Sequence, residues 1–353
     1  MKCCTECFSS EHLRTIIQSN SSEIGRCNFC GNNGVKLYDP RELLLFFRNL
    51  FDLYAVTDST ISDANPLEIQ ILNDFPNKIF KIADTSVIRK LIVAIVEDEA
   101  DSFIELLKAD VYIECLVNPS TKNEASILEV SWEKFVEEIK FENRFHIKNT
   151  IELTKLEKLL KRHQRDIFKG KILYRARISE KNGFNISEMG NPPRHLTKAG
   201  RANPQGISYL YLASDIDTTV SEIRAALFDF VSIGEFRLKE DITVINLRET
   251  ELYDPIYLAD QDELKDFIIH FPFVYRLEKE ISKPSRRADN ELDYLPTQYL
   301  SEFIKSLGFD GVEYKSSVNP KGHNLAIFST DKFECIKSYV HEVENVTFGH
   351  KKI

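Results

Sequence analysis

Cysteine spacing at the start of the chain constrains the fold more than any other feature. Five of the seven cysteines fall within the first thirty residues, in the stretches CCTEC and CNFCGNNG. Cys4 and Cys7 form one C-x-x-C pair, and Cys27 and Cys30 form another, with 19 residues between the pairs. This spacing is typical of tetrahedral zinc bound by four thiolates. The sequence therefore predicts a structural zinc knuckle over residues 1–39.

Two alternatives to this ligand set stay open. Cys3 is adjacent to Cys4 and could replace it as a ligand. The pairs could also be redox-active or incidental thiols. Gly31 and Gly34 favour zinc, because they permit the tight turn in which backbone N–H groups approach a thiolate. Four thiolates would leave zinc no open position, so this metal would hold structure and perform no chemistry.

The rest of the chain divides where its hydrophobic pattern changes. Over residues 40–169, apolar side chains recur at spacings of three and four, and glycine is absent between Val35 and Phe168. This pattern predicts an all-α helical domain. Over residues 170–353, short β-rich runs such as ILYRARI and SYLYLAS alternate with helical stretches. This pattern predicts an α+β domain.

Composition and motifs exclude several classes of protein. A net charge of -9 gives no general attraction for phosphate backbones, so a nucleic-acid partner is disfavoured. No apolar run is long enough to cross a bilayer, and the first residues lack the apolar segment of a secretory signal. We therefore expect a cytoplasmic protein without a membrane partner. The chain also lacks the G-x-x-x-x-G-K-[ST] phosphate loop, a strand followed by G-x-G-x-x-G, and H-E-x-x-H.

A scattered set of polar residues remains in the α+β region. Arg175 lies in ILYRARI, and Arg201 precedes the run SYLYLAS, which contains Tyr211. Glu222 lies in the helical stretch TTVSEIRAAL that follows. Two serines come directly after FDGVEYK near the end of the chain.

With these residues in place, the region from Gly170 to the neighbourhood of Lys337 resembles the RES domain, a family named for its arginine, glutamate and serine. The resemblance is carried by LYRAR, by GRANPQG feeding SYLYLAS, by TTVSEIR, and by FDGVEYKSSVNPKGHNLAIFS. It implies a multidomain protein whose C-terminal domain has a fold similar to ADP-ribosylating toxins. The site residues that it implies are Arg175, Tyr211, Glu222 and Ser316 for catalysis and Arg201, Ser317 and Asn324 for nucleotide binding. Either serine of the pair could be the site serine.

The resemblance also implies an activity. Members of the family destroy NAD by phosphorolysis or hydrolysis, or transfer ADP-ribose to a protein, commonly as the toxin of a toxin–antitoxin pair. NAD would then be the substrate, with phosphate as one candidate co-substrate. An antitoxin protein or the attached N-terminal domain would restrain the enzyme. Residues 40–169 would resemble HEPN helical bundles, although this region has no arginine followed four to six residues later by histidine, so RNA cleavage is not expected.

The residue types suit this chemistry. Breaking the bond between nicotinamide and ribose develops positive charge at the anomeric carbon, and the Glu222 carboxylate would oppose that charge. Arg175 and Arg201 would bind the pyrophosphate through their planar donors. Tyr211 would offer an aromatic face to nicotinamide or a hydroxyl to the ribose, and the serine would bind a ribose or phosphate oxygen.

Each assignment has an alternative. Thr219 to Glu222 reads as T-x-x-E, a capping box in which the glutamate would only bond back to the helix start. The arginines and the tyrosine could be ordinary strand residues, and the serine pair could be a turn. His195 and His323 are alternative acid–base groups, but neither has an identifiable carboxylate partner in the sequence. A non-enzymatic interaction protein that contains zinc, and a homo-oligomer, also stay open.

Overall fold

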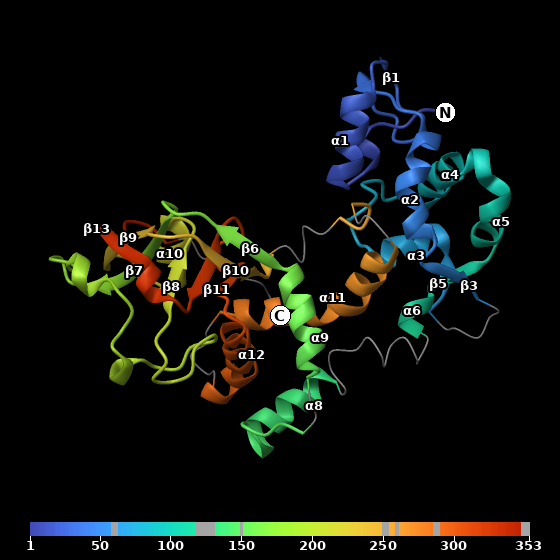
Figure 1. Cartoon of the computed structure of the whole chain (residues 1–353). Coiled ribbons are helices and arrows are strands. Elements are labelled where there is room, and N and C mark those ends of the chain that lie inside the picture. The colour runs from blue at the N-terminus through green and yellow to red at the C-terminus, as the bar shows by residue number, and fades with distance from the viewer. Residues whose placement is uncertain are drawn as a thin grey trace. The chain divides into compact units, whose positions relative to one another are not determined.

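The computed structural model describes residues 1–57, 63–117, 131–148, 151–248, 254–257, 261–284 and 290–346 (Figure 1). The chain divides into two compact units. The first unit comprises Met1–Ser126 and Leu252–Phe271, and the second comprises Ile127–Glu251 and Pro272–Ile353. Within the described ranges, no helix combines the length and the apolar character needed to span a bilayer.

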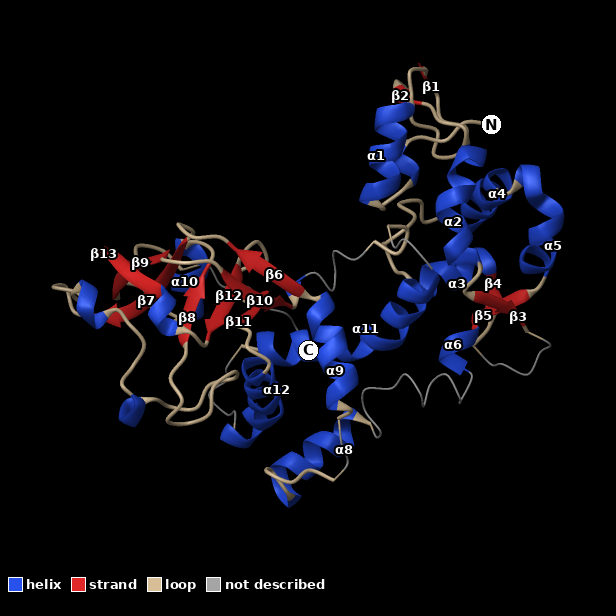
Figure 2. Cartoon of the chain, in the orientation of Figure 1, coloured by secondary structure: helices blue, strands red, loops and turns tan. Residues whose placement is uncertain are grey.

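The first unit is mixed, with helices and short strands (Figure 2). Its elements are α1 (Glu11–Asn20), β1 (Ile24–Gly25), β2 (Val35–Lys36), α2 (Leu44–Phe51), β3 (Tyr54–Val56), β4 (Asn65–Pro66), α3 (Leu67–Asp74), α4 (Thr85–Ile95), α5 (Ala100–Lys108), β5 (Asp110–Ile113) and α6 (Glu114–Val117), together with the first part of α11 (Gln261–Ser282).

Helices of this unit begin where the sequence supplies a cap. Ser10 Oγ accepts a hydrogen bond from the backbone N–H of Leu13 at the start of α1, at 3.1 Å. Asp84 accepts one from the N–H of Ser86 at the start of α4, at 2.9 Å. These caps satisfy N–H groups that have no partner inside the helix. The helices then bury a core rich in phenylalanine, in which Phe47 lies over Phe80 at 5.9 Å.

The expectation that residues 40–169 form one all-α domain is wrong in two respects. First, β3, β5 and β4 form a three-stranded antiparallel sheet in the first unit. Second, α8 (Trp132–Glu137), α9 (Leu153–Arg162) and β6 (Gln164–Ile167) belong to the second unit. The strands of the small sheet are two to four residues long. They are too short for an alternating pattern to stand out from the helical periodicity around them.

The second unit is built around an eight-stranded sheet in the order β13-β9-β7-β8-β12-β11-β10-β6. All neighbouring strands are antiparallel except the parallel pair β10 and β11. Besides β6, its strands are β7 (Ile172–Ser179), β8 (Leu210–Ala213), β9 (Phe230–Leu238), β10 (Ile242–Asn246), β11 (Gly311–Lys315), β12 (His323–Ile327) and β13 (Phe333–Glu342). Its helices are α8, α9, α10 (Ile216–Glu222), the last part of α11, and α12 (Leu295–Ser306).

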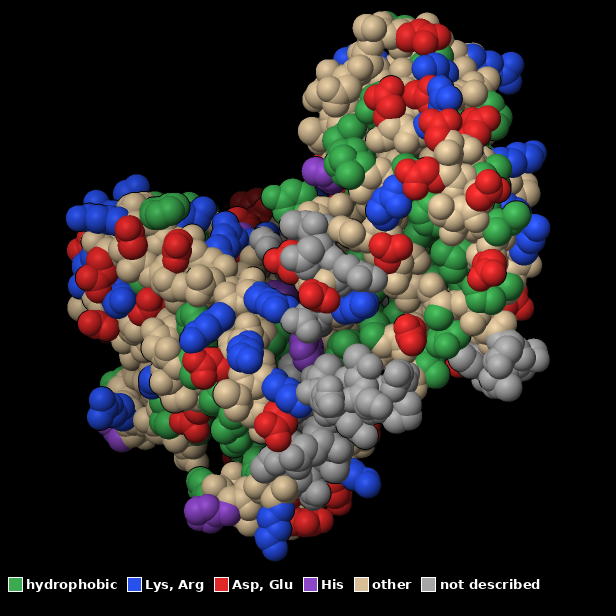
Figure 3. Space-filling view, turned by 45° about the vertical axis from the view of Figure 1, so that its right-hand side comes forward, with side chains coloured by type: hydrophobic (Ala, Val, Ile, Leu, Met, Phe, Trp, Pro, Cys, Tyr) green, Lys and Arg blue, Asp and Glu red, His purple; other side chains and the backbone are tan. Residues whose placement is uncertain are grey.

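Alternation along the strands gives this sheet two apolar faces. On one face, Val312 and Ala326 pack with Leu300 of α12 and with residues of α8, α9 and α11. On the other face, Leu212 and Leu325 pack in a separate cluster with Leu173, Met189, Val244 and Leu238. On the face drawn in Figure 3, the positively charged lysine and arginine side chains are interspersed with the negatively charged aspartate and glutamate side chains.

The sheet opens between β7 and β8, and this opening positions the candidate site. The two strands share a single registered pair, Tyr174 with Ala213. Beyond it, the N–H of Ala176 donates instead to Oγ1 of Thr219 on α10, at 2.8 Å. The helix therefore takes over a hydrogen bond that the sheet would otherwise make, and α10 packs on β7 and β8.

We predict that Gly311→Ala destabilises the second unit. A Cβ at Gly311 would lie 2.6 Å from the backbone oxygen of Ala326 in the neighbouring strand. Overpacking of this kind costs about 1–3 kcal/mol, so the melting temperature should fall by about 2–12 °C. Gly190→Ala is the control, because its Cβ would meet nothing within 4 Å. Equal melting temperatures for the two variants would contradict the prediction.

Candidate functional site

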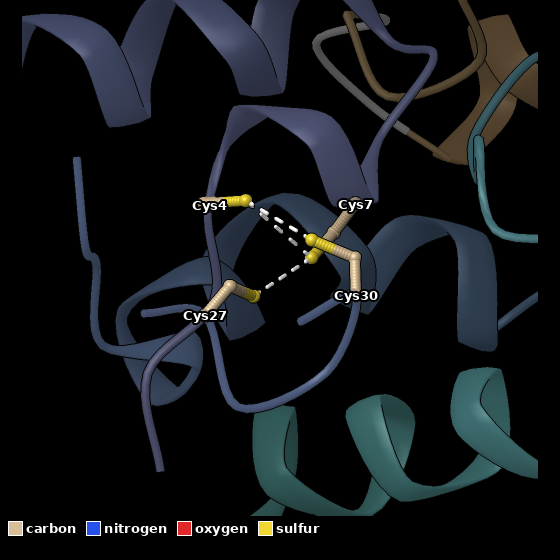
Figure 4. A group of neighbouring side chains, drawn as sticks. All are labelled: Cys4, Cys7, Cys27 and Cys30. Atoms are coloured by element: carbon tan, nitrogen blue, oxygen red, sulfur yellow. Dashed lines mark hydrogen bonds between the residues drawn. The ribbon is translucent and has the colours of Figure 1, made fainter. Parts of the chain in front are cut away.

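Four cysteine sulfurs converge in the first unit (Figure 4). The sulfurs of Cys4, Cys7, Cys27 and Cys30 all lie within 4.8 Å of one another. The Cys4–Cys30 separation is 3.4 Å, Cys7–Cys27 is 3.5 Å and Cys4–Cys7 is 4.0 Å. Sulfurs bound to zinc at 2.3 Å in a tetrahedron would lie about 3.8 Å apart. The cluster therefore could hold a metal ion, as the spacing of the cysteines predicts.

The local backbone explains why these four sulfurs meet. The N–H of Phe29 points to the sulfur of Cys27 at 3.4 Å, in the manner of a knuckle turn. The chain then reverses through Gly31 and Gly34, whose φ angles of 77° and 68° are ones that glycine adopts without strain. Cys3 does not join the cluster, because its sulfur is directed to the carbonyl oxygen of Tyr38 at 3.5 Å. The ligand set with Cys4 is therefore the one that the geometry supports.

A second candidate site lies in the second unit, beside the opening between β7 and β8. It consists of two adjoining pockets that share Tyr211, Glu222 and Tyr314. The first lobe, of 270 Å³, is completed by Arg175, Ala176, Leu212, Ala213, Thr219, Ile223 and Asn324. The second lobe, of 200 Å³, is completed by Gly200, Arg201, Arg224, Ile281, Ser282, Lys283, Pro284 and Val318.

Glu222 lies at the wall between the two lobes. It is the last residue of α10, and Asp215, not Thr219, caps the start of that helix by accepting from the N–H of Thr218. The capping-box alternative is therefore excluded. Oε1 of Glu222 instead accepts hydrogen bonds from Ser316 Oγ at 2.7 Å and from Asn324 Nδ2 at 2.6 Å.

The structure separates the two serines. Ser316 is buried, and besides donating to Glu222 its Oγ accepts from the N–H groups of Val318 and Asn319 at 3.3 and 3.1 Å. Ser317 is exposed and lines neither lobe. The structure therefore brings Ser316 and Asn324 to Glu222 and leaves Ser317 outside.

Arg175 reaches the first lobe from β7. Its Nη1 donates to the carbonyl oxygens of Met189, at 3.0 Å, and Gly190. Burial, and next the charge of Arg177, lower the pKa of Arg175 to about 10. The guanidinium stays charged at neutral pH in a partly desolvated place, where its attraction for an anion is stronger than in water.

Tyr211 and Arg201 are both fixed by their surroundings. The hydroxyl of Tyr211 donates to Oδ1 of Asn203 at 2.8 Å, and burial raises its pKa. Arg201 Nη2 donates to the carbonyl oxygen of Pro284 at 3.1 Å, and its guanidinium lies 4.9 Å from the ring centroid of Tyr294.

Sequence reasoning missed three residues of this site. Asn203 is buried and its Nδ2 donates to the carbonyl oxygens of Lys198, Pro204 and Ile207, so it holds the GRANPQG loop and Tyr211 together. Tyr314 lines both lobes, and Thr219 closes the first. Tyr314 could have been found, because period-two alternation puts it on the same side of its strand as Ser316.

His195 and His323, the alternative acid–base groups, lie outside both lobes. His195 is exposed in a short turn. His323 does have a carboxylate partner, which sequence reasoning missed: its Nε2 lies 3.0 Å from Glu313 Oε1. Glu313 is buried and also binds Arg165 at 3.0 Å and Arg248 at 2.7 Å. Glu313 precedes Tyr314 on β11, so the two side chains point to opposite faces of the sheet.

Comparison with known proteins identifies the family. The family model of the RES domain matches residues 172–348, half of the chain. The chain therefore belongs to the RES-domain family, as its motifs predict. No curated protein sequence matches the chain. A solved structure that matches is the crystal structure of the M. tuberculosis MbcT-MbcA toxin-antitoxin complex, with 14% identity, a TM-score of 0.31, and coverage of 53% of this chain and 91% of that chain. At this TM-score the match assigns no role to any residue.

We predict that the cluster binds about one metal ion per chain through its four cysteines. Cys27→Ser should remove most of the bound metal and lower the melting temperature, because metal binding contributes to folding. Cys3→Ser is the control, since its sulfur points away from the cluster. Metal content by elemental analysis checks both. Loss of metal in Cys3→Ser but not in Cys27→Ser would contradict this ligand set.

A second prediction concerns pH. Burial, and next the charge of Arg248, lower the pKa of His323 to about 4 in the folded protein, against about 6.5 when unfolded. The unfolded state therefore binds the proton first, and stability falls as pH drops from about 6.5 toward 4, by about 1–2 kcal/mol from this group. His323→Asn should narrow the difference in melting temperature between pH 7 and pH 5. His195→Asn, an exposed control, should leave that difference unchanged.

Proposed function

We propose that this protein consumes NAD by cleaving the bond between nicotinamide and ribose. The observation that carries the proposal is the Glu222 carboxylate, fixed by Ser316 and Asn324 at the wall of a two-lobed pocket in a RES-family domain. The toxin-like ADP-ribosyltransferase fold of this domain, and the HEPN-like character of residues 40–169, remain predictions from sequence.

The hydrogen bonds to Glu222 suit it to this reaction. Both donors bind Oε1, and within the described ranges Oε2 accepts no hydrogen bond. Oε2 is thus the oxygen left for the ribose. As nicotinamide departs, positive charge grows at the anomeric carbon, and a carboxylate held in advance stabilises that charge without reorganising. Ser316 and Asn324 would act by holding the carboxylate in place.

The surrounding groups fit the remaining parts of NAD. Nη1 of Arg175 donates to two carbonyl oxygens, and Nε and Nη2 form no hydrogen bond with described residues, so they would be the donors available to a ligand in the first lobe. Arg201 brings a second guanidinium to the other lobe. Tyr211 lines both lobes and its hydroxyl is already bonded to Asn203, so it would contact nicotinamide or ribose chiefly through its aromatic ring. Ser317, which lies outside, would take no part.

Water and phosphate both remain candidate acceptors for the ADP-ribosyl group. Attack by water would make the protein an NAD glycohydrolase, and attack by phosphate would make it an NAD phosphorylase. Either product follows from the same cleavage, because the carboxylate acts on the ribose and not on the acceptor. Loss of NAD would harm the producing cell. We therefore propose that the protein acts as a toxin, restrained by an antitoxin or by its own N-terminal unit.

Zinc is the metal that we propose for the four-cysteine cluster. Thiolates select soft or borderline cations, and four of them close the tetrahedron. The ion would order the first unit and would not touch NAD.

The decisive experiment compares wild type with Glu222→Gln for NAD loss and nicotinamide release, with and without phosphate. The amide retains the shape of the side chain and removes its charge. We expect the rate to fall about a hundredfold or more, the usual effect of losing one preorganised electrostatic group. Phosphate dependence of the wild-type rate would identify the acceptor.

Glu302→Gln is the matched control, because Glu302 is exposed on α12 and lines neither lobe. It should consume NAD at the wild-type rate. Equal rates for wild type and Glu222→Gln would overturn the role given to the carboxylate.

A further inference from the structure

Arg224 has an unusual backbone. It follows the end of α10 by two residues and has φ of 53°, in the left-handed region. Asn77 and Phe228 are the other non-glycine residues with positive φ in the described ranges, and neither lines the candidate site. Arg224 is the residue just past the C-cap Ile223, where helices commonly end with one left-handed residue, usually glycine, which adopts this conformation without strain. The turn itself does not require an arginine here, and this arginine brings a guanidinium to the pocket.

The charges around Arg224 point to the kind of ligand that its side chain would bind. It lines the 200 Å³ lobe with Arg201 and Lys283. Lys283 is paired with Glu280 at 2.5 Å, and Arg201 is held by the carbonyl oxygen of Pro284. For Arg224, no ion pair or side-chain hydrogen bond is formed with any described part of the chain. The lobe thus contains an exposed guanidinium that forms no ion pair with a described carboxylate, although Glu222 lines the same lobe.

The two lobes differ in a way that fits a substrate with two chemically distinct parts. Of the two lobes, Arg175, Thr219 and Asn324 line the first, and Arg201 and Arg224 line the second; Arg201 also borders a separate pocket of 580 Å³. Glu222 faces both. A molecule whose reacting carbon lies at Glu222 would therefore place its neighbouring group in the lobe that Arg201 and Arg224 line. Planar guanidinium donors match the oxygens of a diphosphate.

We propose that Arg224 is a specificity-determining residue that binds the diphosphate of the substrate in the 200 Å³ lobe, together with Arg201. This inference rests on the proposed function, and it adds the requirement that the substrate carry a diphosphate next to the ribose that is cleaved. Arg224 binds and orients the substrate and takes no part in breaking the bond.

The test compares NAD with nicotinamide riboside, which has the same scissile bond and no phosphate. The variant is Arg224→Gly, because glycine adopts φ of 53° without strain and the fold should be retained. We expect kcat/KM for NAD to fall about tenfold or more, mainly through KM, because a charge-assisted contact to the substrate is lost. For nicotinamide riboside, kcat/KM should stay within about twofold of wild type. For Arg224→Lys, kcat/KM for NAD should lie between the values of wild type and Arg224→Gly, because lysine supplies charge without the planar set of donors.

Arg194→Ala is the control, an exposed arginine in the same unit that lines neither lobe. Arg194→Ala should have the wild-type kcat/KM for both substrates. The inference would be overturned if Arg224→Gly lowered kcat/KM equally for both substrates, or if it left kcat/KM for NAD unchanged. Either result would leave the proposed function in place.

If wild type cleaves neither substrate, the proposed function fails, and binding of inorganic pyrophosphate by calorimetry still decides the role of Arg224. Wild type should then bind pyrophosphate about tenfold or more tightly than Arg224→Gly. Equal binding by both proteins would overturn the inference.

Discussion

Two hydrogen bonds to a single oxygen of Glu222 hold the site of the second unit together. They come from Ser316 and Asn324, on either side of the loop that joins β11 to β12. The same loop is tied to the other end of α10, where Asn319 Nδ2 donates to Thr218 Oγ1 at 2.8 Å. A helix of seven residues is not stable alone. The loop and the opened sheet therefore fix both the position of α10 and the carboxylate at its end.

The parts predicted from sequence are those in which neighbouring residues carry the signal. The two cysteine pairs each bring their sulfurs together through a short turn, so spacing alone identified the cluster. The RES family likewise follows from short motifs that keep their order along the chain, and the family match covers the region where they lie. The geometry then brings Ser316 and Asn324 to Glu222 as a group, although their roles in catalysis remain a proposal.

The parts that could not be predicted depend on contacts between distant segments. Asn203 looks like an ordinary loop residue, and its importance appears only when the loop folds back on Tyr211. The strand pairing of Asn65 with Val111 joins residues far apart in sequence, so helical periodicity concealed the small sheet. The T-x-x-E pattern that ends at Glu222 was ambiguous because the true cap lies further upstream, at Asp215.

The edge strand β6 has a practical consequence. It lies at residues 164–167, before the family match begins at 172, yet it completes the large sheet by pairing with β10. Its Arg165 is also one of the partners of the buried Glu313. A truncated protein that starts at residue 172 would expose the backbone edge of β10. It would also lack Arg165, one of the positively charged partners of the buried Glu313 carboxylate. Open strand edges recruit other chains, so the boundary drawn by family similarity is one at which the excised domain would aggregate.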